Sequence, residues 1–364
     1  MTYRAIGLMS GSSLDGLDLV FTEISVSGNN WSYRILHADC RTYSSEWKER
    51  LQNATTLSAE AYVQLHSDYG HLLGRMVNEF IAENGLEYKV QLICSHGHTT
   101  FHHPAAGYTH QLGDGAAIAA ETGIHVVSDL RNMDVALGGQ GAPIVPIGEL
   151  KLMPQFDYFL NLGGIANLSA NTRPYTAFDV CPANRVLNLL TQDEGMEYDN
   201  KGMLAATGTL QPDLLEQLNV LPYYKKTFPK SLSNSFGTET IYPILKQSGY
   251  STADLLRTYT EHIADEIRNA LQLLTTTPAA EQQQLLVTGG GAFNEFLIQR
   301  LTEKLKAINI HLVLAEPELI QYKEALIMAF LGVLRWREES NVLQSVTGAS
   351  RNSIGGAVWM GQSW

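Results

Sequence analysis

The stretch IGLMSGSSLDGLDLV, residues 6–20, decides how this chain begins to fold. Two apolar runs flank a turn of Gly, Ser and Asp residues, a pattern typical of a β-hairpin. The turn is longer and more polar than a hairpin needs, so it is either an ordinary turn or a loop that wraps a phosphate beside a hydrated Mg²⁺. Its residues, with the first positions of the second run, are Gly11, Ser12, Ser13, Leu14, Asp15, Gly16, Leu17 and Asp18.

The composition is that of a globular protein. The 364 residues are 45% hydrophobic, enough to bury a large core in roughly two domains. The apolar runs are too short and interrupted to span a bilayer, and the N-terminus does not resemble a secretory signal. Three widely spaced cysteines fit a reducing cytoplasm. The net charge of −12 argues against nucleic acid or an anionic membrane as a partner.

The order of the predicted elements contains two rounds of a hairpin followed by helices. The second round begins at FDYFLNLGGIANLSA, residues 156–170, where a strand again meets Gly-Gly and continues as a strand. A short strand, YTAFDV, precedes a helix that we expect to begin at Pro182. The other predicted strands are 4–10, 17–26, 31–40, 90–95 and 124–128, and the other predicted helices are about 58–85, 252–275, 292–306 and 319–337.

Between the rounds lies DLRNMDVALGGQGAPIVP, residues 129–146, rich in Gly and ending in two prolines. It is interpreted either as a linker or as a hinge whose loop faces a cleft between two domains.

Three glycine clusters suggest a nucleotide gripped between two similar lobes. They are the hairpin turn described above, NLGG with Gly163 and Gly164, and VTGGGAF with Gly289, Gly290 and Gly291. The third joins an apolar strand to a helix, where Gly lets the backbone approach a ligand and the helix N-terminus favours an anion. No P-loop or GxGxxG spacing occurs, so neither a P-loop NTPase nor a Rossmann dehydrogenase is indicated.

The motifs resemble those of the anhydro-N-acetylmuramic acid kinase family, in the same order and over nearly the whole chain. They are GLMSGSSLDGLDLV, SHGHTTFHHP, the block from QLGDGAAIAAETGIHVVSDLR to GGQGAPIVP, NLGGIANLS, FDVCPAN, YDNKG, VTGGGAFN, KEALIMAF and VTGAS. The resemblance implies two RNase-H-like lobes of the actin-like ATPase type around a nucleotide and sugar cleft. It also implies a cytoplasmic enzyme of cell-wall recycling, usually a homodimer. That family uses ATP and Mg²⁺ to open a 1,6-anhydro sugar with water and to phosphorylate O6.

The resemblance makes Asp179, in FDVCPAN, the general base that activates water for attack at the anomeric carbon. An alternative from the residues alone is that Asp179 caps the following helix. Asp15 and Asp18 are expected near Mg²⁺, directly or through water, and the three glycine clusters are expected to contact ATP. Cys181, beside Asp179, has no paired His in the motif and is expected to be a buried small residue rather than a nucleophile.

SHGHTTFHHPAAGYTH holds five of the eleven histidines, but their spacing matches no HExxH motif and no acidic cluster accompanies them. We expect this segment to line the sugar pocket, with Gly97 and Thr99 near the substrate. Arg131 contacts either the substrate's lactyl carboxylate or sugar, or else forms a surface ion pair with Asp129 or Asp134. Glu324 resembles a family residue that contacts the sugar; otherwise it belongs to a solvated helix face.

Two blocks depart from the family's pattern. The usual FDTGPGN is FDVCPAN here, and the usual PKSTGRE is the longer PKSLSNSFGTE without its arginine. Both departures concern the substrate half, so a kinase of another anhydro sugar, or a non-catalytic sugar or nucleotide sensor, remains an alternative. The expected lobes are 1–130 with 340–364, and 131–339.

Overall fold

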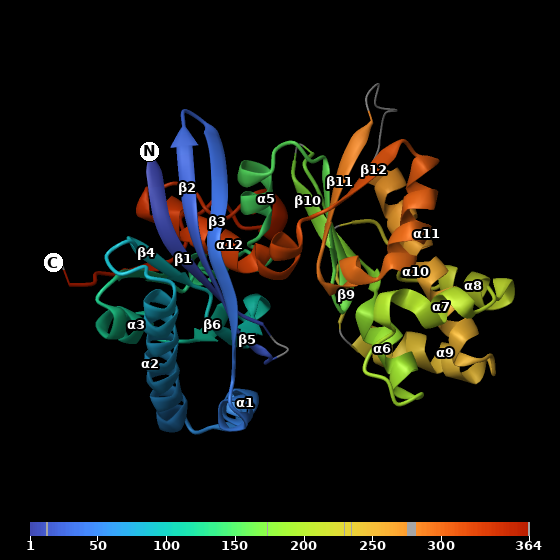
Figure 1. The fold of residues 1–364 in the computed structure, drawn as a ribbon, viewed down its shortest axis with the longest axis horizontal. Helices are drawn as coiled ribbons and strands as arrows, with labels where there is room; N and C mark the ends of the chain where they lie inside the picture. The colour runs from blue at the N-terminus through green and yellow to red at the C-terminus, as the bar shows by residue number, and fades with distance from the viewer. Residues whose placement is uncertain (12–13, 173, 229, 234, 275–281, 363–364) are drawn as a thin grey trace. The chain divides into compact units, whose positions relative to one another are not determined.

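The structure is a computed structural model that describes residues 1–11, 14–172, 174–228, 230–233, 235–274 and 282–362. It divides into two compact units, Met1–Met153 with Tyr322–Trp364, and Pro154–Gln321 (Figure 1). No helix among the described residues is both long enough and apolar enough to cross a membrane.

The first unit is built on a mixed sheet with strand order β13-β7-β4-β1-β2-β3. Strands β1, β2 and β3 are successive antiparallel neighbours, whereas β4 and β7 run parallel to β1. A separate hairpin, β5–β6, follows β4. The strands are β1 (Thr2–Ser10), β2 (Gly16–Ser27), β3 (Asn30–Thr42), β4 (Leu92–Ser95), β5 (His98–His103), β6 (Tyr108–Leu112), β7 (His125–Ser128) and β13 (Ala357–Trp359).

Helices cover both faces of this sheet. Strand β1 alternates its side chains between the faces. Ile6 and Leu8 join the core formed with the buried face of α2, and a Cβ added to Gly7 would lie 1.8 Å from the Ala325 carbonyl oxygen of α12. Gly7 therefore lets α12 pack directly on the strand. The helices are α1 (Ser45–Gln52), α2 (Ala59–Glu83), α3 (Gly115–Thr122), α4 (Asn132–Ala136), α5 (Pro146–Leu152), α12 (Pro317–Trp336) and α13 (Gln344–Thr347).

The second unit repeats the same topology, with strand order β10-β9-β8-β11-β12. Its first three strands are antiparallel neighbours, and β11 and β12 are parallel to β8. The elements are β8 (Tyr158–Leu162), β9 (Ile165–Ala170), β10 (Thr176–Pro182), α6 (Asn184–Gln192), α7 (Met203–Thr207), α8 (Pro212–Asn219), α9 (Tyr242–Gln247), α10 (Thr252–Leu274), β11 (Gln283–Thr288), α11 (Glu295–Lys306) and β12 (Ile310–Leu314).

Three antiparallel strands followed by two strands parallel to the first is the RNase-H-like arrangement, and it occurs once in each unit. The predicted fold class, α/β with two RNase-H-like units, is confirmed by this strand order. The first unit adds β13, antiparallel to β7, at one sheet edge.

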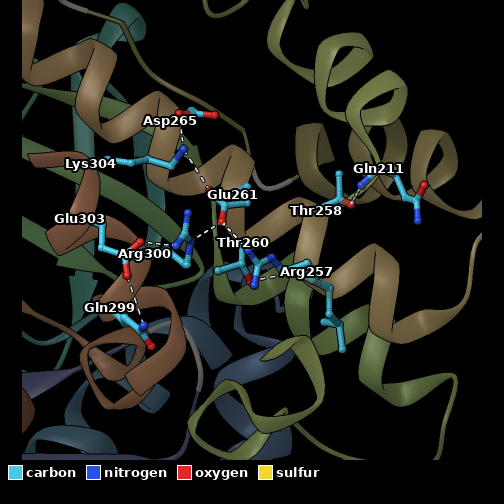
Figure 2. Close-up of polar contacts among 11 residues, drawn as sticks. Gln211, Arg257, Thr258, Thr260, Glu261, Asp265, Gln299, Arg300, Glu303 and Lys304 are labelled. Carbon is cyan, nitrogen blue, oxygen red and sulfur yellow. Dashed lines mark hydrogen bonds and ion pairs between the residues drawn. The ribbon is translucent and has the colours of Figure 1, made fainter. Parts of the chain in front are cut away.

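A buried ion cluster joins α10 to α11 in the second unit (Figure 2). Glu261 is 2% exposed and accepts from Arg257 of its own helix at 3.2 Å and from Lys304 of α11 at 3.0 Å. Arg300 of α11 also binds this carboxylate and, in addition, the exposed Glu303. Burial would raise the pKa of Glu261, but Arg300 and Lys304 lower it overall. The cluster holds the two helices together.

The expected lobe boundaries near residues 130 and 340 both lie inside the first unit. The chain passes between units at 153/154 and 321/322 instead, because the flanking helices are anchored in the first unit. Lys151 of α5 lies over the ring of Trp31 in β3, 5.9 Å from its centroid. Lys323 of α12 and Glu149 of α5 form a buried ion pair of 2.9 Å.

The segment 129–146 is not a linker: it forms α4 and a loop that packs within the first unit. Asp134, fully buried, accepts from the Gly141 N–H and the Thr347 hydroxyl, both at 2.7 Å. These bonds tie the loop to α13, an attachment that glycine content alone does not reveal.

Candidate active site

Two carboxylates, Asp15 in the turn between β1 and β2 and Asp18 on β2, lie near enough for their charges to interact. Asp18 lies on β2 opposite Cys40 of β3, whose thiol hydrogen-bonds to it, and Asp15 is exposed at the turn. Burial raises the pKa of Asp18 above its usual range; the Cys40 bond opposes this, and the charges of Glu324 and Asp15 add to it. The structure thus brings Asp15, Asp18 and Glu324 into one electrostatic neighbourhood.

Other residues of this turn have mainly structural surroundings. A Cβ at Gly16 would lie 2.5 Å from the Arg41 carbonyl oxygen, so glycine is required for β2 to pair closely with β3. Leu17 is in the core, and Leu14 has a positive φ of 59° with its N–H 3.4 Å from the Gly11 oxygen. Ser12 and Ser13 lie outside the described residues.

The carboxylate pair fits a hydrated Mg²⁺. Like charges raise the pKa of a carboxyl by mutual repulsion, and a divalent cation relieves that repulsion. Mg²⁺ commonly uses one or two carboxylates and keeps several waters. No cluster of three or more His, Cys, Asp or Glu side chains with metal-binding geometry occurs among the described residues. Two carboxylates in one neighbourhood would suit a Mg²⁺ that keeps several of its waters.

Arg131 is held by neutral groups rather than by carboxylates. Its Nε donates to Nε2 of His96 and its Nη1 to the carbonyl oxygen of Gly141, each at 2.9 Å. Within the described part of the chain, no carboxylate oxygen lies within 4.0 Å of its guanidinium. The alternative ion pair of Arg131 with Asp129 or Asp134 is therefore not formed among the described residues; Asp129 accepts from the Ser128 hydroxyl, and Asp134 from the Gly141 N–H and the Thr347 hydroxyl.

Burial lowers the pKa of Arg131 to about 10, and the negative charge of Glu324, on the exposed side of α12, raises it in part. At neutral pH the guanidinium stays charged. A cation in largely buried surroundings, bound only to neutral acceptors, is suited to receive an anionic group of a ligand.

The histidine-rich segment forms the hairpin β5–β6. His102 bonds the hydroxyl of Thr109 at 3.1 Å, His110 bonds Tyr62 at 2.8 Å, and His103 packs on Tyr108. His98 is buried, with its Nδ1 3.4 Å from the hydroxyl of Ser10 at the end of β1. These contacts give the histidines structural partners, while Gly97 is buried and Thr99 is exposed at the start of the hairpin.

Asp179 lies within β10 and does not cap a helix. Helix α6 begins at Asn184, not at Pro182, and its cap residue Ala183 makes no side-chain capping bond. One oxygen of Asp179 accepts from the side-chain amide of Asn167, and the other accepts from the Leu232 N–H at 2.7 Å. The backbone is also fixed, because the Tyr223 hydroxyl donates to the Asp179 carbonyl at 2.7 Å.

The environment of Asp179 suits a base. Burial raises the pKa of its carboxyl above the usual range, and the Leu232 N–H and the Asn167 amide lower it in part. No cation within ion-pair distance neutralises it among the described residues. A carboxylate that is oriented by neutral donors and made more basic by burial meets the requirement of general-base catalysis. Cys181 is fully buried, as expected of a small core residue, and burial raises the pKa of its thiol.

Glycine turns of the second unit converge on Asn184 at the start of α6. The Asn184 N–H donates to the Gly163 oxygen at 3.1 Å, and its side chain donates to the Leu162 oxygen at 3.0 Å. Gly289 has φ 82°, and a Cβ at Gly291 would lie 2.9 Å from the Asn184 Oδ1. The fold thus brings together the NLGG, VTGGG and FDVCPAN blocks.

The sequence reasoning did not single out Asn167, Tyr223 and Leu232 around Asp179, nor His96 at Arg131. A signal for Asn167 exists in the strand register: Asn161, Asn167 and Asp179 face one another across β8, β9 and β10. Predicting it requires the pairing of strands as well as the motif.

Two RNase-H-like units with glycine turns at strand ends, together with a carboxylate oriented by neutral donors, place this chain in the class of α/β proteins built from two such units. The chain belongs to the anhydro-N-acetylmuramic acid kinase family, whose model matches residues 3–361.

Two relatives named anhydro-N-acetylmuramic acid kinase illustrate this membership. The protein from Idiomarina loihiensis is 32% identical over 98% of this chain and 99% of its own length. That from Photobacterium profundum is 34% identical over 98% of each. Among solved structures, the activator of 2-hydroxyisocaproyl-CoA dehydratase from Clostridium difficile, with bound ADPNP, is 11% identical with a TM-score of 0.45, covering 92% of this chain and 96% of that one. The fold assignment rests on the strand order, not on that likeness.

Proposed function

We propose that this chain opens 1,6-anhydro-N-acetylmuramic acid with water and transfers the γ-phosphate of ATP to O6, giving N-acetylmuramic acid 6-phosphate in cell-wall recycling. Family membership over nearly the whole chain supports this activity. The single structural observation that carries it is the carboxylate of Asp179, held through both oxygens by neutral donors inside a strand.

Asp179 is proposed to take a proton from the water that attacks the anomeric carbon. An anhydro sugar has no free 6-hydroxyl, so ring opening must release O6 before it accepts a phosphoryl group. Asn167 and Leu232 fix the carboxylate, and Tyr223 fixes the backbone that carries it. A base held in this way is already oriented, so no further conformational entropy is lost when it accepts the proton of the water.

The nucleotide is proposed to contact the glycine-rich turns. Backbone N–H groups in such turns bind phosphate oxygens, and glycine permits close approach. The proposed contacts are Gly11, Ser12, Ser13, Leu14, Asp15, Gly16, Leu17, Asp18, Gly163, Gly164, Gly289, Gly290 and Gly291. When bound, Mg²⁺ would neutralise phosphate charge. Asp15 and Asp18 would hold it, directly or through water, because their carboxylates lie close enough to repel each other.

Arg131, Gly97, Thr99 and Glu324 are proposed to bind the sugar. The charge of Arg131 lacks a carboxylate partner among the described residues, and the substrate carries one carboxylate, on its lactyl group. A guanidinium fork suits such a group. We further propose a cytoplasmic homodimer, which light scattering of the purified protein and cell fractionation can check.

A kinase of another anhydro sugar remains the second candidate. Two residues of the altered block PKSLSNSFGTE bond to Asp179: the Leu232 N–H donates to its carboxylate, and the Lys230 carbonyl accepts from its backbone N–H. The altered block is therefore in direct contact with the proposed base. ATP consumption should be measured with 1,6-anhydro-N-acetylmuramic acid and with anhydro sugars that lack the lactyl or N-acetyl group. Turnover restricted to another sugar selects the second candidate, and absence of turnover with all of them indicates a sensor.

A further inference from the structure

Arg131 is seated in a rigid frame. Its two acceptors are the His96 ring and the Gly141 carbonyl. Gly141 is itself fixed, because its N–H donates to the buried Asp134, which also accepts from Thr347. Nη2 of Arg131 has no acceptor among the described residues, so the Nη2 side of the guanidinium remains available for a carboxylate.

The contacts of His96 determine its tautomer. Nδ1 lies 2.9 Å from the carbonyl oxygen of Gly97, and a carbonyl only accepts, so Nδ1 carries the proton. Nε2 is then unprotonated and accepts from Arg131 Nε at 2.9 Å. Burial, and then the charge of Arg131, lower the pKa of His96 to about 3, so the ring stays neutral throughout the physiological range.

A neutral acceptor has a consequence that a carboxylate would not have. It orients the guanidinium through Nε without adding a negative charge, whereas an Asp or Glu at this place would form an ion pair with it. His96 is 4% exposed at the end of β4, and its N–H donates to the Leu8 oxygen of β1. The backbone that carries the imidazole is therefore anchored to β1, a central strand of the sheet.

We infer that His96 is a positioning residue: its unprotonated Nε2 holds Arg131 so that the free edge of the guanidinium receives the carboxylate of the substrate's lactyl group. This rests on the proposed function, since it requires that the chain binds a sugar with that group. His96 thereby contributes to the preference for a muramic over a glucosamine-type anhydro sugar without touching either one.

The test measures calorimetric affinity of the full-length protein for 1,6-anhydro-N-acetylmuramic acid and for 1,6-anhydro-N-acetylglucosamine, which lacks the lactyl group. His96→Leu removes the acceptor and should weaken binding of the muramic sugar about tenfold to hundredfold, the range for a hydrogen bond to a charged group. Binding of the glucosamine sugar should not change. His96→Gln can place its Oε1 near the position of Nε2 and should stay close to wild type.

Matched variants separate this role from general destabilisation. His125→Gln alters a half-buried histidine of the same sheet, one that accepts from the Gly361 N–H and stacks on Trp336, and should leave the ratio of the two affinities unchanged. If His96→Leu does not fold, His96→Asn replaces it, since its shorter side chain is polar but cannot reach Arg131 Nε.

Three results overturn the inference: equal weakening for both sugars, no weakening for either, or equal effects of the Asn and Gln variants. A wild-type protein that binds and phosphorylates the muramic sugar while giving one of these results refutes the inference alone. A wild-type protein that binds neither sugar refutes the proposed function and, with it, this inference.

Discussion

Two carboxylates of the second unit, Glu261 and Asp179, show how different partners give one functional group different roles. Glu261 is surrounded by Arg257, Arg300 and Lys304, and its pKa is lowered despite burial. Asp179 has only neutral donors, Asn167 and Leu232, and burial keeps its pKa raised. The first carboxylate is stabilised as an anion and joins two helices, whereas the second is oriented but remains basic.

The largest effect is expected at Asp179. Asp179→Asn keeps the size of the side chain but removes the base, so turnover should fall ~10²–10⁴-fold. The fold should persist, because the Asn167 amide can rotate to present its oxygen to the new amide. Turnover and calorimetric sugar affinity are measured together. Turnover within about tenfold of wild type, below the range for a lost base, would remove the catalytic role from Asp179.

Glu261→Gln should have the opposite effects: a loss of stability with little change in turnover. Removing the charge leaves three neighbouring cations with only Glu303 and Asp265 as partners among the described residues, which should lower the free energy of unfolding by about 3 kcal/mol, the lower end for breaking a buried pair. Turnover per folded molecule should remain near wild type. Urea denaturation measures the first quantity and steady-state kinetics the second.

The matched control is Glu303→Gln, which removes the 44%-exposed partner of Arg300 on the same helix. An exposed pair contributes about 0–1 kcal/mol, so this variant should be nearly neutral. Equal destabilisation by the two variants would contradict the assignment of Glu261 as the centre of the cluster.

Asn167→Ala keeps the Asp179 carboxylate but removes one of the two donors that orient it. The carboxylate loses one donor, so turnover should fall roughly tenfold, near the lower limit for a hydrogen bond to a charged group. The acidic limb of the pH profile of turnover should also move upward, because the lost donor was lowering the pKa of Asp179.

Asn171→Ala serves as the control for this variant, since that residue follows the same strand and bonds the Phe156 carbonyl instead. An unchanged pH profile in Asn167→Ala would show that Asn167 does not act on the base.

The smallest effects concern the pH dependence of stability, and their signs differ. The folded pKa of Glu261 lies below its ordinary value of 4.5, so its contribution is present above that pH and is lost as pH falls through the lowered pKa. The folded pKa of Asp179 lies above 3.8, so its contribution is present below that pH and is lost as pH rises through the raised pKa.

At pH 7, therefore, Asp179→Asn should leave the unfolding free energy equal or higher, whereas Glu261→Gln lowers it. Denaturation curves between about pH 3 and pH 7 check both signs, since the ordinary carboxyl pKa values lie in that interval. If Asp179→Asn lost as much stability at pH 7 as Glu261→Gln, both carboxylates would stabilise the fold as anions, and the proposed difference between them would be wrong.

The sequence alone predicted most strands and the long helices, because their apolar periodicity follows from local burial. The expected strands at 4–10, 17–26 and 31–40 lie within β1, β2 and β3, and the expected helix 252–275 corresponds to α10. The sequence reasoning missed the hairpin β5–β6, whose polar and histidine-rich residues lack alternation. Motif resemblance, not periodicity, indicated Asp179 and Arg131.

What the sequence determined by itself is the family and the fold class, together with the candidate site residues, since these depend on local pattern and motif order. Tertiary structure decided the partners. Glu261 and Arg300 lie on different helices, and Asp179 receives one of its donors from Leu232. Arg131 lies close to Asp129 and Asp134 in the sequence, but in the folded chain its Nε donates to His96. Burial and the charge of contacting groups set whether a carboxylate is structural or reactive, and both arise only when distant segments pack together.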